Sequence, residues 1–223
     1  TGKDDQPVGG FYVDFFARSN KRAGAWMDQC LNRGRDHGQV QIPVAHLVCN
    51  YARPSGDRPS LLTHDEVVTL FHEMGHVLHH LLTRIDYPSV AGINGVPWDA
   101  VELPSQFMET FAWEPEVVSL CSAHYQTGEP LPAAILKSLR ESKNFQAGLD
   151  LVRQIEFALF DMRIHSGPVP PDSARIAGIL HEVRAEVAAI RYPEWNRFAH
   201  AFTHIFGRSE ERRVGKECRS RWS

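Results

Sequence analysis

The stretch THDEVVTLFHEMGHVLHHL, residues 63–81, carries the clearest structural signal in the chain. Its first four residues have the S/T-x-x-E form of a capping box, which predicts that a helix begins at Thr63 and runs to about Thr83. The apolar residues of this stretch recur at helical spacing; they are Val67, Leu70, Phe71, Met74, Val77, Leu78 and Leu81. We therefore expect one long helix here, with an apolar face that packs on a core.

An HExxH motif lies in the middle of this predicted helix, at residues 72–76. Residues four apart project from the same face of a helix, so the imidazoles of His72 and His76 can bind one metal ion. Imidazole ligands favour zinc over magnesium or calcium, which prefer oxygen ligands. Glu73 is rotated by about 100° from His72. From there it can take a proton from a zinc-activated water without binding the metal itself.

A zinc site of this kind needs a third protein ligand. The pattern HExxHxxGxxH is absent, because His79 stands at the Gly position and Leu82 at the third His position. The remaining candidates are Glu102 and Glu109, which lie about two turns apart on one face of a later predicted helix. One of the two can bind the metal while the other accepts a hydrogen bond from a ligand histidine. Their spacing leaves both assignments open.

The remaining pattern predicts a mainly α fold with a small antiparallel sheet near the N-terminus. Two aromatic or apolar segments, residues 9–18 and 42–51, are expected to be strands. A Gly/Pro-rich loop over 85–98 is followed by a helix that begins between residues 99 and 104 and ends before Pro115. Further helices are expected at 115–125, 131–142, 145–165, 172–191 and 195–205, with Phe145, Phe157 and Phe160 in the core.

Composition excludes several classes of protein. The 223 residues are 43% hydrophobic and 23% charged with a net charge of −3, which is typical of a globular chain with one full-sized core. The sequence has no basic amphipathic stretch and no apolar run of about 18 residues, so we expect neither nucleic acid nor a membrane as partner. Four cysteines without framework spacing suit a reducing compartment, and we expect a cytoplasmic protein.

Long runs on both sides of the motif resemble the thimet-type oligopeptidase family of zinc metallopeptidases. The two most specific are LTHDEVVTLFHEMGH at 62–76 and GVPWDAVELPSQFME at 95–109. The resemblance extends over residues 9–207 and includes GAWMDQC (24–30), HYQTGEPLP (124–132), QIEFALFDMR (154–163) and RFAHAFTHIFG (197–207). It implies a fragment of a zincin-like, helical metallopeptidase catalytic domain.

The resemblance also implies a role for each residue around the metal. The ligands of a single zinc ion would be His72, His76 and Glu102. Glu109 would accept a hydrogen bond from a ligand histidine, and Glu73 would be the general base. In this way the resemblance favours one of the two assignments that the spacing of the glutamates leaves open.

Three further residues are implied to meet the substrate. His204, in the HIFG run, would hold the substrate or the oxyanion of the transition state. Gly92 and Gly95 would line the substrate cleft, because glycine permits a close approach of the backbone. The implied activity is a zinc-dependent endopeptidase that hydrolyses short peptides, including fragments of cleaved signal peptides, and that is a monomer when full length.

Two alternatives stay open. The family places a Gly- and Tyr-rich segment directly after the HIFG run and a helical half before the catalytic half, and neither is present in this sequence. The first alternative is that the chain is a zinc-binding but catalytically inert fragment. In the second it derives from a dipeptidyl carboxypeptidase of the same family.

The last sixteen residues, RSEERRVGKECRSRWS at 208–223, differ from the rest. They carry six basic and three acidic side chains, whereas residues 1–207 carry 18 basic and 24 acidic ones. This segment has no helical or strand period and resembles the in-frame translation of a sequencing adapter. We expect residues 1–207 to be the catalytic-domain fragment and 208–223 to be a non-native tail. The alternative is a solvated basic tail.

Overall fold

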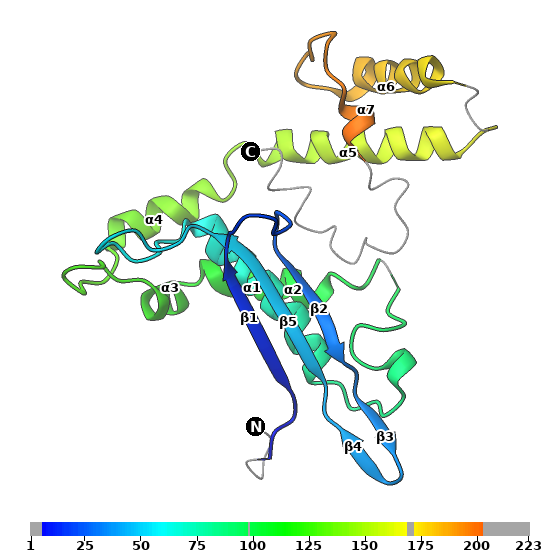
Figure 1. The fold of residues 1–223 in the computed structure, drawn as a ribbon. Helices are drawn as coiled ribbons and strands as arrows, with labels where there is room; N and C mark the ends of the chain where they lie inside the picture. The colour runs from blue at the N-terminus through cyan, green and yellow to red at the C-terminus, as the bar shows by residue number, and fades with distance from the viewer. Residues whose placement is uncertain (1–5, 98, 169–171, 203–223) are drawn as a thin grey trace. The chain divides into compact units, whose positions relative to one another are not determined.

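The computed structural model describes residues 6–97, 99–168 and 172–202 (Figure 1). Within these residues the chain divides into two compact units, one over 6–131 and one over 132–202. The first unit contains a small sheet and the helix of the HExxH motif, and the regular elements described in the second are all helices. The prediction of a mainly α fold with a small sheet near the N-terminus is confirmed.

The sheet of the first unit has three strands in the order β1-β5-β2 (Figure 1). They are β1 (Gly10–Phe16), β2 (Trp26–Leu31) and β5 (Val44–Tyr51). The two predicted strands are therefore confirmed as β1 and β5. Between β2 and β5 the chain forms a hairpin of two short strands, β3 (Gly34–Asp36) and β4 (Gln39–Gln41).

The expectation of an antiparallel sheet is wrong for one of its two strand pairs. β2 is antiparallel to β5, but β1 is parallel to β5. The physical reason is the number of chain reversals. The chain turns back after β1 to form β2 and turns again through the β3–β4 hairpin, so β5 returns in the direction of β1 and lies between the two earlier strands. β2 was not predicted, because Asp28 and Gln29 interrupt its apolar pattern.

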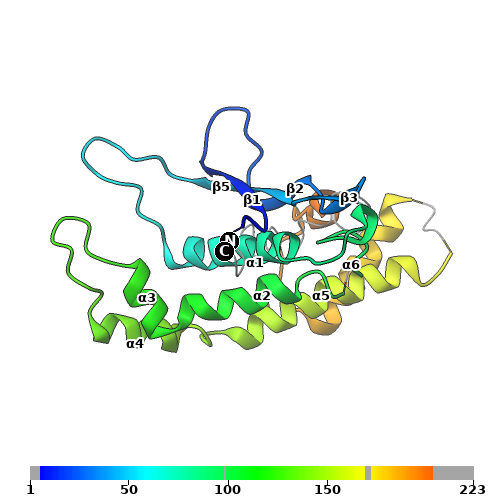
Figure 2. The ribbon, with the colours of Figure 1, turned by 90° about the horizontal axis from the view of Figure 1, so that it is seen from below.

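Helix α1 (His64–Leu81) covers one face of this sheet (Figure 2). The capping box is formed as predicted: the Glu66 backbone N–H donates to Thr63 Oγ1, and the Thr63 N–H donates to Glu66 Oε2. Every second residue of β5, from Ala45 to Tyr51, is buried against the helix. The same core contains Met27, Val77, Leu81 and Ile93. Burial of this face holds α1 on the sheet and so positions the motif.

Shorter helices complete the first unit. The loop after α1 contains a 3₁₀ turn, η1 (Pro88–Val90), and leads to α2 (Leu103–Glu109). A second 3₁₀ turn, η2 (Thr110–Trp113), and α3 (Pro115–Cys121) follow. The predicted helix between residue 99 and Pro115 is confirmed as α2 and η2.

The second unit contains α4 (Ala133–Ser142), α5 (Ala147–His165), α6 (Ser173–Val187) and α7 (Phe198–Ala201). Each lies within the range predicted for it. Its core includes stacked rings of Phe157 and Phe198, with centroids 4.9 Å apart. Phe160 is buried as expected, but the prediction for Phe145 is wrong. Phe145 is 74% exposed, because it lies in the turn between α4 and α5 and not on a helix face.

A buried charge network also stabilises the second unit. Glu156 is 1% exposed, and its Oε1 accepts hydrogen bonds from Arg153 Nη1 at 2.8 Å and from Arg184 Nε at 2.9 Å. Pairing of this kind offsets the cost of burying the carboxylate. No helix in the described part of the chain has the length and apolar character that a bilayer crossing requires.

Candidate metal centre

The site depends on a close approach of α1 and α2. A Cβ atom added to Gly75 would lie 2.5 Å from Ser105 Cα and 2.7 Å from the Pro104 carbonyl oxygen. Any larger residue at position 75 would therefore push the two helices apart. The glycine in the middle of the HExxH motif lets the backbone of α2 touch α1, and this contact brings Glu102 and Glu109 to the histidines.

We expect Gly75→Ala to destabilise the metal-free protein by about 1–3 kcal/mol, because overpacking at the crossing outweighs the better helix propensity of alanine. Gly178→Ala is the matched control, since Gly178 also lies within a helix and a Cβ there would meet no described atom within 4 Å. The control should gain about 0.5–1 kcal/mol. Urea unfolding of both variants checks the prediction, and a gain in stability for Gly75→Ala would contradict it.

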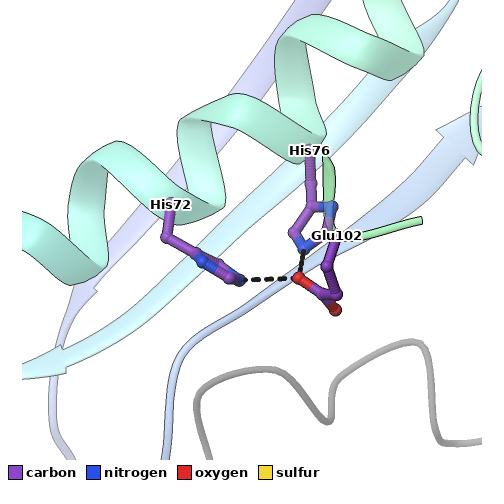
Figure 3. A group of neighbouring side chains, drawn as sticks. All are labelled: His72, His76 and Glu102. Carbon is purple, nitrogen blue, oxygen red and sulfur yellow. Dashed lines mark ion pairs between the residues drawn. The ribbon is translucent and has the colours of Figure 1, made fainter. Parts of the chain in front are cut away.

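Three potential ligands converge on one point (Figure 3). The Glu102 Oε2 atom lies 3.1 Å from His72 Nε2 and 3.2 Å from His76 Nε2, and the ligand atoms of the three residues all lie within 4.8 Å of one another. A tetrahedral zinc ion, bound at about 2.0–2.1 Å, holds its ligand atoms about 3.3 Å apart. The two separations from Glu102 are therefore close to those of a zinc site, and two imidazoles with a carboxylate are donors that suit zinc.

Glu109 contacts the imidazole of His72 at the ring nitrogen that faces away from Glu102. Its Oε1 lies 2.6 Å from His72 Nδ1, whereas Glu102 lies at His72 Nε2. A neutral His72 that donates its Nδ1 hydrogen to Glu109 keeps the Nε2 lone pair for a metal. The structure thus brings both candidate glutamates to the histidines and gives them different atoms to contact.

The electrostatics of Glu102 favour its charged form. Burial raises the pKa of the Glu102 carboxyl, but its close contacts with His72, His76 and Ser105 lower it by more, so the pKa lies well below its ordinary value. The carboxylate is therefore ionised at neutral pH, which is the state that binds a metal cation.

Glu73 is 3% exposed, and His72 and His76 are also buried. Glutamate side chains are rarely this buried, and on a helix with an ordinary solvent-exposed polar face Glu73 would be exposed. It lies one residue after His72 on α1, so it is rotated by about 100° from that ligand. Its role as the group that takes a proton from a metal-activated water stays a prediction.

The glycine loop after α1 is packed against the end of the helix. Gly92 and Gly95 both have positive φ angles, 63° and 70°. A Cβ on Gly92 would lie 2.4 Å from Nδ1 of His80, a fully buried residue whose Nε2 donates to the Leu31 carbonyl oxygen at 2.9 Å. Gly92 thus has a packing reason of its own, and lining of a substrate cleft by these glycines stays a prediction. His204 and residues 208–223 lie outside the described residues.

Sequence reasoning missed Ser105. Its side chain is fully buried, and Oγ lies 2.7 Å from Glu102 Oε2 and 2.9 Å from the Glu102 carbonyl oxygen. The available signal was its position three residues after Glu102, which places it on the same side of the helix. A serine at that spacing is too common to single out without the contact.

Comparison with known proteins gives long matches to peptidases. The chain is 55% identical over 199 residues to oligopeptidase A of Escherichia coli strain K12. It is 43% identical over 205 residues to a probable cytosolic oligopeptidase A of Arabidopsis thaliana. It is 40% identical over 158 residues to the dipeptidyl carboxypeptidase of E. coli strain K12.

These matches cover most of this chain but only part of each relative. The match to E. coli oligopeptidase A covers 89% of this chain and 29% of the relative. For the Arabidopsis relative the two shares are 90% and 29%, and for the dipeptidyl carboxypeptidase they are 70% and 22%. The chain therefore spans less than a third of the length of these relatives. The family model described as peptidase family M3 matches residues 2–209. This match takes in both helices of the metal centre, and the chain belongs to peptidase family M3.

Proposed function

We propose that this chain is the metal-binding part of a zinc-dependent endopeptidase that hydrolyses short peptides, similar to oligopeptidase A. The observation that carries the proposal is the convergence of His72, His76 and Glu102 on one point between two helices. The family and the names of the relatives support peptide hydrolysis. On this proposal the first unit is the zincin-like core of the catalytic domain.

The chemistry follows from this donor set. When bound, zinc would supply Lewis acidity, which lowers the pKa of water towards about 7 and polarises a peptide carbonyl. Glu73 would take the proton from the attacking water and pass it to the departing amine. Glu109 would hold His72 in the tautomer that presents Nε2 to the metal.

The remaining assignments extend the proposal to the substrate. His204 would hold the substrate or stabilise the developing oxyanion, and Gly92 and Gly95 would line the cleft.

Residues 1–207 would be the catalytic-domain fragment and 208–223 a non-native tail. The name of the Arabidopsis relative supports a cytoplasmic location. Short peptides, including fragments of cleaved signal peptides, would be the substrates of a protein that is monomeric when full length.

The test uses the purified chain and the product of the complete reading frame that contains it. Each is freed of metal, loaded with zinc and given a quenched fluorescent peptide. We expect one zinc ion per chain, and cleavage that a chelator stops and added zinc restores. Failure of the chain to bind zinc would overturn the proposal. Zinc binding without cleavage by either protein would instead favour a zinc-binding but catalytically inert protein.

A dipeptidyl carboxypeptidase is the second candidate, because the chain is 40% identical to one over 158 residues. Product analysis separates the two activities. A peptide with a blocked C-terminus is a good substrate for an endopeptidase only. Release of dipeptides from free C-termini, with no cleavage of the blocked peptide, would favour the second candidate.

A further inference from the structure

The Ser105 hydroxyl contacts the carboxylate of the third potential zinc ligand. Oγ lies 2.7 Å from Glu102 Oε2, the same atom that lies 3.1 Å from His72 Nε2 and 3.2 Å from His76 Nε2. Ser105 is fully buried at the point where α2 touches Gly75 of α1. Its position is therefore fixed by backbone packing, whereas the Glu102 side chain must be held through three rotatable bonds.

The hydroxyl has two possible acceptors, and the chemistry favours one of them. Ser105 Oγ also lies 2.9 Å from the Glu102 carbonyl oxygen, which already accepts a hydrogen bond from the Gln106 N–H. A hydroxyl has one hydrogen, and its bond to an ionised acceptor is about twice as strong as its bond to a neutral one. The hydrogen is therefore directed mainly to the carboxylate.

We propose that Ser105 is a positioning residue for the metal centre. It holds the Glu102 carboxylate in the orientation that completes the ligand set, without touching the metal itself. This inference rests on the zinc site of the proposed function and adds a residue to it. Partners that orient a metal ligand in this way typically contribute 10–100-fold to metal affinity.

A purely local role has to be separated from this one. Helical serines often donate to a carbonyl one turn back, and Ser142 of α4 does so with the Leu139 carbonyl oxygen at 2.7 Å. Ser142 is exposed, and no carboxylate contact accompanies this bond among the described contacts. Ser142→Ala therefore removes the same local bond and is the matched control for Ser105→Ala.

The experiment measures zinc affinity of the full chain by competition with a chromophoric chelator. We expect Ser105→Ala to weaken zinc binding by about 10–100-fold. Ser142→Ala should stay within about twofold of the unsubstituted chain, because surface substitutions of this kind are close to neutral. Urea unfolding of the metal-free variants shows whether both are folded.

A double substitution tests whether Ser105 acts through Glu102. In a Glu102→Ala background, Ser105→Ala should cause no further loss of zinc affinity. An equal loss in both backgrounds would mean that Ser105 acts through the general structure, and would overturn the proposal. Unchanged affinity of Ser105→Ala in a chain that binds zinc would overturn it too, while leaving the proposed function intact. A chain that does not bind zinc would overturn both.

Discussion

Glu73→Gln is expected to abolish peptide cleavage while zinc stays bound. The amide has the shape of the carboxylate, so the buried position beside His72 is still filled, but it cannot accept a proton from the attacking water. Loss of a general base typically costs about 10²–10⁴-fold in rate. The measurement compares kcat on a quenched fluorescent peptide with zinc content per chain, in the product of the complete reading frame.

Glu141→Gln provides the control for this prediction. It is the same chemical change on the exposed face of α4, where Glu141 Oε1 lies 3.8 Å from Lys137 Nζ. Exposed pairs of this kind contribute little, so this variant should keep normal activity. If a pure, zinc-loaded Glu73→Gln protein still cleaved peptides at a normal rate, the assignment of Glu73 as the base would be wrong.

The second large effect distinguishes the roles of Glu102 and Glu109, which their spacing in the sequence leaves open. Glu102→Ala removes a proposed ligand, and we expect zinc affinity to fall at least about 100-fold. This loss is roughly one ligand's share of the binding free energy of a structural zinc site. Glu109→Ala removes only the acceptor at His72 Nδ1 and should cost less, about 10-fold or somewhat more. Competition titrations on both variants show which substitution weakens zinc binding more. A larger loss for Glu109→Ala would mean that Glu109 is the ligand and Glu102 the hydrogen-bond acceptor.

Much of the fold was predictable because its signals are local. The capping box at Thr63 and the helical period of the following residues predicted α1, and the structure confirms its start. The direction of β1 was not predictable in this way. It depends on β5 inserting between two earlier strands, which is a long-range pairing that no short window of sequence encodes.

The same division holds at the metal centre. His72 and His76 could be paired from their spacing, because one turn of helix brings them together. The different contacts of Glu102 and Glu109 could not be predicted, because their spacing puts both on one face of the predicted helix. They are distinguished by the place where α2 crosses α1, at Gly75. Ser105 was hidden for the same reason, since its partner is evident only after the crossing is known.

The central position of β5 has a consequence for the order of folding. β1 and β2 each pair with β5 in this sheet, so neither has its sheet partner until the chain has been synthesised as far as Tyr51. Pairing between strands that are distant in sequence slows folding, because the intervening chain must first be closed into a loop. Because α1 shares its core with β5, we expect this helix to dock only once the three strands can pair. On this expectation the two histidines of the motif are ordered together with the sheet, and Glu102 completes the ligand set only when α2 packs on α1.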